Sequence, residues 1–335
     1  MSKATNHFIY NQEGVLTKSL ITSWESPSNI ALVKYWGKKE NQIPANPSIS
    51  FTLSNCKTIT KLNCSVGKEL NFEVWTEGAR KESFEPKIDT FLKRILPYCP
   101  YLNGLSLKID TQNTFPHSSG IASSASGLSA LSLCIMDIEK SLNPQMEDSF
   151  FIQKASFLAR LGSGSAARSV YPGLASWGIT AAFEKSSDLF ASPFIHAHPY
   201  FQDYQDTILL IDEGQKTVSS TVGHNLMHDH PYAQNRFNQA HSNLEELKNV
   251  LIEGDKKRFI ELVESEALTL HAMMMCSNPY FILMKPNTLK AIEKIWEYRK
   301  ANNSNICFTL DAGANVHVLY PANEKHEVQS FLESE

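Results

Sequence analysis

The sequence lacks several features that would place its 335 residues in common functional classes. Its six cysteines are scattered without a C-x-x-C pair, so we expect reduced, packed thiols and no cysteine-based zinc site. No run of about 18 apolar residues is available to span a bilayer. The first residues also lack the apolar core of a signal peptide. We therefore expect a cytoplasmic protein without a membrane partner.

The composition is typical of a globular protein with two domains. Hydrophobic residues make up 42% and charged residues 20%. The net charge of −4 lacks the excess of positive charge that is typical of nucleic-acid-binding proteins. The chain is too long for one ordinary hydrophobic core. Pro193, Pro199 and polar residues interrupt the periodicity between residues 192 and 203. We therefore predict domains over residues 19–198 and 199–335, preceded by a loosely held extension.

A stretch of small residues, Asn113 to Gly127, separates a predicted strand from a predicted helix. Apolar and polar residues alternate before it, and the apolar run Leu128 to Leu142 follows it. Small side chains leave backbone N–H groups uncovered at the positive end of a helix, where they can bind a polyphosphate. The G-x-x-x-x-G-K-[ST] motif is missing. The stretch is thus a phosphate loop of another type, with a flexible linker as the alternative.

Three other segments carry residues suited to anionic ligands. Lys34 and Lys38 would share one face if their segment is helical, and aromatic neighbours argue against a free surface. Arg168 lies between small residues and an apolar run, which favours a buried guanidinium with a carboxylate or phosphate partner. Asp311 lies in the turn of a predicted hairpin, where an aspartate alone usually just forms the turn.

Together these segments resemble the GHMP small-molecule kinase superfamily and, within it, the diphosphomevalonate decarboxylase family. The resemblance rests on Ser28-Asn-Ile-Ala-Leu-Val-Lys-Tyr-Trp-Gly-Lys38, Pro116-His-Ser-Ser-Gly-Ile-Ala-Ser-Ser-Ala125, Gly162-Ser-Gly-Ser-Ala-Ala-Arg-Ser169 and Thr309-Leu-Asp-Ala-Gly-Ala-Asn315, in the family's order. It implies a two-domain α+β fold of the GHMP kinase type. The N-terminal domain would be ribosomal-protein-S5-like, the C-terminal domain a ferredoxin-like α/β sandwich, and the active site would lie between them.

The resemblance also implies a reaction. Members of this family decarboxylate mevalonate 5-diphosphate with ATP to give isopentenyl diphosphate, in the mevalonate pathway of isoprenoid biosynthesis. The 3-hydroxyl is phosphorylated first, and phosphate and carbon dioxide are then lost. ATP and Mg²⁺ are the expected cofactors, and a homodimer is the expected assembly.

Residue roles follow from the same resemblance. The implied catalytic residues are Asp311, Arg168 and Lys34, with Arg168 on the substrate carboxylate. The implied substrate-binding residues are Tyr35, Lys38, Asn46, Ser48, Ser163 and Ser165. The implied ATP-binding residues are Pro116, Ser118, Ser119, Gly120, Ala122, Ser123 and Ser124. No side-chain cluster is assigned to a metal, and Mg²⁺ would accompany ATP near Ser124. The sequence departs from the expected pattern at Pro47, His117 and Ala314, the last in place of proline.

Several alternatives remain open at this point. A related enzyme could stop after phosphorylation, as a mevalonate 3-kinase, or decarboxylate the monophosphate. The joint presence of Lys34, Arg168 and Asp311 favours decarboxylation but does not decide between mono- and diphosphate. A metal-dependent hydrolase could use the histidines of the segment His224 to His230, although the glutamate of H-E-x-x-H is missing. The intact motif set argues against an inactive binding protein on the same scaffold.

Overall fold

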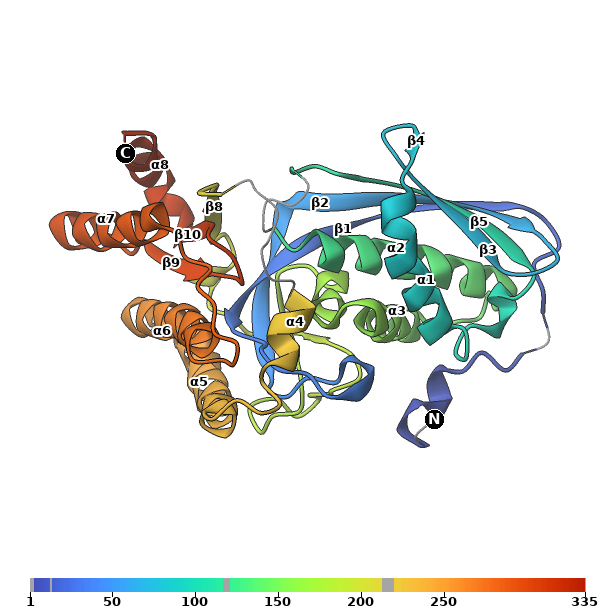
Figure 1. The fold of residues 1–335 in the computed structure, drawn as a ribbon, viewed down its shortest axis with the longest axis horizontal. Coiled ribbons are helices and arrows are strands. Elements are labelled where there is room, and N and C mark those ends of the chain that lie inside the picture. Colours follow the sequence, from blue (N-terminus) through green and yellow to red (C-terminus); the bar gives the residue numbers. More distant parts are fainter. Residues whose placement is uncertain (1–2, 13, 117–120, 213–219, 335) are drawn as a thin grey trace.

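Two β-sheets of unequal size organise the chain, and helices pack against each of them (Figure 1). The computed structural model describes residues 3–12, 14–116, 121–212 and 220–334. The larger sheet is built from residues 20–193 and the smaller one from residues 205–320. The predicted mixed α+β architecture is confirmed. The domain boundary proposed at residues 198 and 199 lies in the connection between β7 (Ser192–Pro193) and β8 (Gln205–Leu209), and it stays a prediction.

The larger sheet is centred on one long strand, β2. In the described residues its order is β4-β3-β5-β2-β6-β7, with β1 also paired to β2. All neighbours are antiparallel except β3 and β5. The strands are β1 (Leu20–Val33), β2 (Ser48–Val66), β3 (Asn71–Thr76), β4 (Ala79–Arg80), β5 (Leu105–Asn113), β6 (Leu174–Trp177) and β7 (Ser192–Pro193).

Strand β1 continues through Pro27, although a proline within such a run predicts an interruption of the strand. The register with β2 shifts between Pro27 and Ser28, and a bulge of this kind accommodates a residue that cannot donate to the ladder. The residues after the bulge are buried and bring the chain into the interior at Lys34. The proposed helical face for Lys34 and Lys38 is wrong, because β1 extends to Val33 and Lys38 forms a β-bridge with Pro44.

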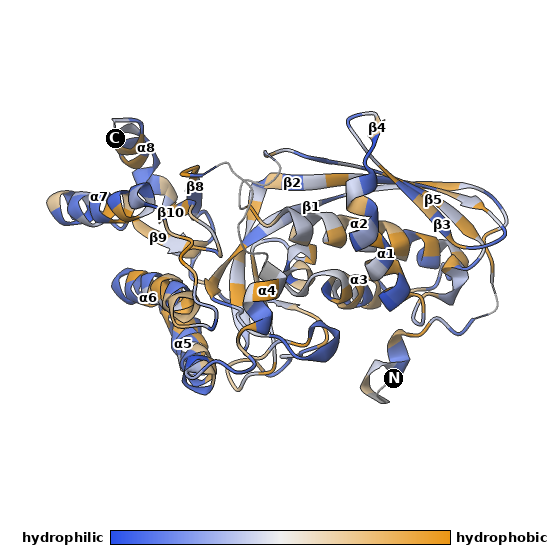
Figure 2. Cartoon of the chain, viewed as in Figure 1, coloured by the Kyte–Doolittle hydropathy of each residue, from blue (hydrophilic) through white to orange (hydrophobic). Residues whose placement is uncertain are grey.

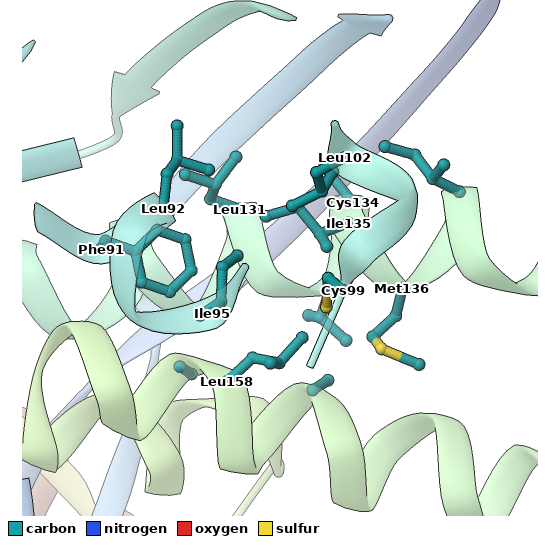
Figure 3. Close-up of a cluster of buried hydrophobic side chains, with 14 of the residues drawn as sticks. Phe91, Leu92, Ile95, Cys99, Leu102, Leu131, Cys134, Ile135, Met136 and Leu158 are labelled. Carbon is teal, nitrogen blue, oxygen red and sulfur yellow. The ribbon is translucent and has the colours of Figure 1, made fainter. Parts of the chain in front are cut away.

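Three helices lie on one side of the larger sheet: α1 (Glu85–Ile95), α2 (Ser123–Leu142) and α3 (Asp148–Gly162) (Figure 1). Helix α2 is buried on most sides because it packs against the sheet and also against α3. Figure 3 shows part of this core, where Phe91 and Ile95 of α1 approach Leu131 of α2 and Leu158 of α3.

Residues 3–10 are held tightly, so the predicted loose extension is wrong for this part of the N-terminal segment. A 3-10 helix covers Lys3–Phe8, and the side chain of Phe8 is fully buried. Its ring stacks on Phe157 of α3 with the centroids 4.2 Å apart. Tyr10 is also buried and packs edge-on against Tyr101. Two aromatic anchors in a polar segment therefore fix the chain before β1.

The smaller sheet has the order β8-β10-β9 in the described residues and is antiparallel. The predicted hairpin is confirmed. The spacing of apolar residues also predicts long amphipathic helices over residues 232–254 and 256–275, and these are confirmed. The elements of this part are β8 (Gln205–Leu209), α4 (Ser220–Asn225), α5 (Ala233–Glu253), α6 (Lys256–Met275), α7 (Pro286–Asn302), β9 (Cys307–Leu310), β10 (Val316–Tyr320) and α8 (Lys325–Ser334). Hydrophilic and hydrophobic residues alternate along α5 and α7, as in helices with one exposed side (Figure 2).

A shared hydrophobic cluster joins the two parts of the molecule. Leu32 and Val33 at the end of β1 belong to the same buried cluster as Leu244 and Leu247 of α5 and Val263 of α6. The end of β1 is therefore packed against helices that are distant in sequence. None of the helices in the described ranges combines the length and apolar character needed to cross a membrane.

We expect Phe8→Ala to destabilise the protein, because it leaves a cavity beside Phe157. Truncation of a buried phenylalanine costs about 3–5 kcal/mol of unfolding free energy. Urea denaturation checks this value, with Asn6→Ala, an exposed residue of the same 3-10 helix, as the control. Equal stability of the two variants would show that the N-terminal segment is not anchored.

Candidate active site

A cavity of about 510 Å³ brings the four sequence motifs together. It is bounded by the end of β1, the start of α2, the segment after α3 and the turn between β9 and β10. The predicted site residues in its lining are Lys34, Tyr35, Lys38, Ala122, Ser123, Ser124, Ser163, Ser165, Arg168 and Asp311. Residues separated by most of the chain thus face one space.

Other predicted site residues lie elsewhere. Asn46 is buried behind the wall, and its Nδ2 donates to the Lys34 carbonyl at 2.9 Å. The Ser48 hydroxyl is likewise buried and accepts a hydrogen bond from Nη1 of Arg168. Pro116 is exposed and outside the lining. Ser118, Ser119 and Gly120, together with His117, lie outside the described residues.

The central contact of the site joins Lys34 to Asp311. The Lys34 Nζ lies 3.2 Å from the Asp311 Oδ1, with the lysine side chain 2% exposed and the aspartate side chain 32% exposed. Burial lowers the pKa of Lys34, while the neighbouring Asp311 and Glu266 carboxylates oppose that change. The carboxylate therefore reaches the cavity with a buried ammonium group beside it.

The hairpin turn that carries Asp311 is held from several sides. His271 of α6 lies with its Nε2 3.1 Å from the Asp311 carbonyl oxygen. Thr288 of α7 donates from Oγ1 to the Ala314 carbonyl at 2.7 Å. The Asn315 side-chain oxygen accepts from the backbone N–H of Ile211 at 2.8 Å. These contacts fix the turn although position 314 is alanine and not the expected proline.

Arg168 is a buried cation whose hydrogen bonds in the described part of the chain all go to neutral oxygens. Its Nε donates to the Ser50 hydroxyl at 2.9 Å, and its Nη2 donates to Asn29 Oδ1 at 3.2 Å. Burial lowers the pKa of Arg168 to about 10. A buried charge is costly without an opposite charge. The predicted burial of Arg168 is confirmed, and its guanidinium is suited to an incoming anion.

Asn29 and Ser50 were not selected from the sequence as site residues. Asn29 lines the cavity, and its Nδ2 donates to Ser169 Oγ at 2.7 Å. Ser50 lies on β2 and is fully buried. The available signal was the run of polar residues within otherwise apolar strands, because buried polar groups require partners.

Two lysines face the outer part of the cavity. Lys38 was predicted, whereas Lys87 of α1 was not. In the described residues neither ammonium group forms an ion pair. Burial and Arg94 lower the pKa of Lys38, and the surrounding protein and Lys38 lower the pKa of Lys87. Nothing in the sequence of α1 distinguishes Lys87 from an ordinary surface lysine such as Lys93.

The start of α2 has the features of a phosphate-binding element. Helix α2 begins at Ser123, and the preceding Ala122 provides no side-chain cap for the first N–H groups. Ala122, Ser123 and Ser124 all line the cavity. Uncapped N–H groups at the start of a long helix suit phosphate. The Ser124 hydroxyl is an oxygen ligand of the kind that suits Mg²⁺ bound together with phosphate oxygens.

The histidines proposed for the hydrolase alternative have separate structural roles. His224 accepts from the Gly37 N–H through Nδ1 at 2.9 Å, and burial lowers its pKa to about 3. His230 lies with Nε2 2.9 Å from the Met273 carbonyl. In the ranges that the structure describes, no group of three or more His, Cys, Asp or Glu residues is placed to hold a metal. The positions of His224 and His230 therefore do not support the alternative of a metal-dependent hydrolase.

A larger hollow of about 720 Å³ lies between Phe51–Lys57 of β2 and the connection that leads into β8. Its lining includes Phe194, Tyr204 and Asp206 but none of the predicted site residues. Size alone would favour it. The smaller cavity is the candidate active site because it contains the buried cations, the carboxylate and the helix start.

This fold and site define a GHMP-type enzyme that acts on an anionic small molecule. Two family models match the chain: the diphosphomevalonate decarboxylase-like N-terminal domain over residues 26–189 and the mevalonate 5-diphosphate decarboxylase C-terminal domain over residues 207–335. The chain belongs to the diphosphomevalonate decarboxylase family.

Individual relatives agree with this assignment. A diphosphomevalonate decarboxylase of Candida albicans is 28% identical and covers 92% of this chain and 86% of its own length. The crystal structure of a mevalonate diphosphate decarboxylase from Legionella pneumophila is 31% identical, with a TM-score of 0.81 over 94% of this chain and 98% of that one. A structure of MDDEF in complex with MVAPP, AMPPCP and magnesium is 28% identical, with a TM-score of 0.81 over 95% and 94% of the two chains.

We expect the stability of the protein to fall as the pH decreases below about 6.5. His224 and His271 have pKa values lowered by burial to about 3 and about 4, against 6.5 for an ordinary histidine. The unfolded chain therefore binds more protons in this window, and each histidine contributes on the order of 1.4 kcal/mol per pH unit. The effect ends once the pH is below the folded-state pKa values.

Urea denaturation at about pH 7, 6 and 5 measures this dependence. His224→Asn keeps an oxygen acceptor for the Gly37 N–H but does not titrate, so its stability should depend less steeply on pH. His228→Asn, at an exposed position of the same segment, serves as the control. Identical slopes for the two variants would contradict the assignment.

Proposed function

We propose that this chain catalyses the ATP-dependent decarboxylation of mevalonate 5-diphosphate to isopentenyl diphosphate, with ADP, phosphate and carbon dioxide as the other products. Family membership supports the reaction. The observation in this chain that carries the proposal is Arg168, a buried guanidinium with neutral partners that lines the same cavity as the Lys34–Asp311 pair. A substrate carboxylate supplies the anionic hydrogen-bond partner that Arg168 lacks in the described residues.

Substrate binding uses the cationic wall of the cavity. The guanidinium of Arg168 binds the substrate carboxylate, for which its planar donors are well suited. Lys38, with Ser163 and Ser165, binds the diphosphate. Lys87 of α1 adds a second ammonium group at the same end. Binding energy from the remote diphosphate then positions the reacting carbon. Asn46 and Ser48 act from behind the wall by holding Lys34 and Arg168 in place.

The first chemical step transfers the γ-phosphoryl group of ATP to the 3-hydroxyl oxygen. The Asp311 carboxylate orients this hydroxyl and accepts its proton as the new P–O bond forms. The N–H groups at the start of α2, the Ser124 hydroxyl and the Lys34 ammonium stabilise charge on the transferring phosphoryl group. Mg²⁺, held with ATP near Ser124, supplies further neutralisation of phosphate charge.

The second step removes phosphate and carbon dioxide. The bond between C3 and the phosphate oxygen breaks, and its electron pair leaves with phosphate. Asp311 passes the proton that it accepted to a phosphate oxygen, and its ionised carboxylate then stabilises the positive charge that develops on C3. The bond between C1 and C2 then breaks, and its electron pair forms the double bond between C2 and C3. Arg168 holds the carboxylate in line until it departs as carbon dioxide.

Further properties belong to the same proposal. ATP and Mg²⁺ are the cofactors, in agreement with the AMPPCP and magnesium in the MDDEF complex. The protein is cytoplasmic and homodimeric, with domains over residues 19–198 and 199–335. The related alternatives are a 3-kinase that stops after phosphorylation and a decarboxylase of the monophosphate.

Carbon dioxide release distinguishes these possibilities. The assay contains ATP and Mg²⁺ with mevalonate, its 5-phosphate or its 5-diphosphate, and ADP is measured in parallel. We expect equal amounts of carbon dioxide and ADP with the diphosphate alone. ADP without carbon dioxide would identify a kinase. A preference for the monophosphate would show that the substrate of the decarboxylation is the 5-phosphate.

We expect Asp311→Ala to abolish turnover while ATP binding remains largely intact, because the variant loses the group that accepts the hydroxyl proton.

Arg168→Gln should reduce turnover by at least about tenfold, which corresponds to about 1.4 kcal/mol in activation free energy. Steady-state kinetics and nucleotide titration measure both effects. Glu293→Ala, at an exposed position of α7, is the control. Full activity of Asp311→Ala would refute the mechanism.

A further inference from the structure

The backbone of Lys34 is held by a buried ion pair from the helices of the C-terminal part. The side chains of Arg236 in α5 and Glu266 in α6 are both fully buried. Arg236 Nη1 donates to Glu266 Oε1 at 3.0 Å, and its Nη2 donates to Oε2. The Lys34 N–H donates to the same Oε2 at 2.8 Å, and Arg236 Nη2 lies 3.3 Å from the Lys34 carbonyl oxygen. One ion pair thus engages both polar groups of the Lys34 backbone.

These contacts provide hydrogen-bond partners for the backbone where β1 ends. The last residue of β1 is Val33, so the Lys34 backbone has left the strand while still buried. Buried backbone groups require hydrogen-bond partners, and charged partners give the stronger bonds. Asn46 also donates to the Lys34 carbonyl, and Asn243 of α5 donates to Glu266 Oε1 at 2.6 Å. The Lys34 backbone is therefore fixed in a connected polar network.

Stability alone does not explain this pair. Replacement of a buried ion pair by well-packed apolar residues is often neutral or stabilising, so retention of the charges calls for another reason. In the described structure the Arg236 Nε is buried without a hydrogen-bond partner. The placement of the pair against the residue that contacts Asp311 supplies that reason.

We propose that Glu266 and Arg236 are positioning residues that hold Lys34 so that its ammonium group meets the Asp311 carboxylate. This inference rests on the proposed function. The pair acts on the reaction through Lys34 and touches no substrate. It also means that α5 and α6 set the geometry of a residue that belongs to the other part of the chain.

The Glu266 charge also affects the Lys34 ammonium group. The titratable groups around Lys34 are Asp311 in the hairpin turn, Glu266 and His271 in α6, and Arg168 after α3. Burial is the main cause that lowers the pKa of Lys34, and Arg168 adds to it, whereas Asp311 and Glu266 oppose it. Removal of the Glu266 charge therefore makes Lys34 lose its proton at lower pH.

The principal test is the double substitution Arg236→Met with Glu266→Leu, which removes both charges and keeps apolar volume in the core. We expect a folded protein whose kcat falls by at least about tenfold while the KM for ATP changes by less than about threefold. Thermal unfolding of the variant confirms the fold. The single substitution Glu266→Gln keeps an oxygen acceptor for the Lys34 N–H, and we expect the alkaline limb of its kcat–pH profile to move to lower pH.

The matched control is Lys154→Met with Glu139→Leu. This pair joins α3 to α2, with Nζ 2.6 Å from Oε2, and its side chains are 0% and 2% exposed. It is a buried ion pair outside the cavity lining, so we expect kcat within about twofold of the parent and an unchanged pH profile.

Each outcome has a distinct meaning. A folded Arg236→Met, Glu266→Leu protein with the kcat of the control would overturn the inference. If that double variant does not fold, Glu266→Gln decides, since an unmoved alkaline limb with unchanged kcat would also overturn it. Absence of carbon dioxide release by the parent protein would instead refute the proposed function.

Discussion

The contact between Lys34 and Asp311 is the interaction on which the site depends. It joins the end of β1 to the turn between β9 and β10, which lie at opposite ends of the sequence. An ammonium group that is 2% exposed remains favourable only with an anion beside it. The packing of the smaller sheet and its helices against β1 is therefore also a condition for the charge state of the site.

The surrounding structure positions this contact at several levels. The bulge at Pro27 lets β1 remain one strand up to Val33, the residue before Lys34. Hydrophobic packing of Leu32 and Val33 against α5 and α6 fixes the position of the strand end. Polar groups then set the direction of the individual side chains. Apolar contacts determine where the elements lie, while hydrogen bonds determine where the reactive atoms point.

Much of this arrangement could be predicted from the sequence, and the reasons differ from one feature to another. The hairpin around Asp311 and the long helices α5 and α6 follow from local periodicity, which one segment carries by itself. The grouping of Lys34, Arg168 and Asp311 came from the resemblance, because no local pattern shows which distant segments meet. Asn46 and Ser48 were expected at the substrate and lie instead behind Lys34 and Arg168.

The features that were missed depend on tertiary structure. Lys87 differs from a surface lysine only because α1 places it beside the cavity. Glu266 and Arg236 occupy ordinary positions in amphipathic helices, and their pairing is visible only when α5 and α6 meet the end of β1. A loose N-terminal extension was expected from the polarity of the segment, whereas the buried side chains of Phe8 and Tyr10 anchor residues 3–10 to the core.

The hydrogen-bond partners of Arg168 in the described residues are all neutral, and this has a consequence for the end of the catalytic cycle. In the proposed reaction, the carboxylate that this guanidinium holds is the group removed as carbon dioxide, so the product has one ionic contact fewer than the substrate. The residues lining the described cavity include four cationic side chains and one carboxylate, and they attract both molecules through the diphosphate. Only the substrate also satisfies the buried guanidinium. Loss of the carboxylate in the proposed reaction therefore weakens the binding of the product and favours its release.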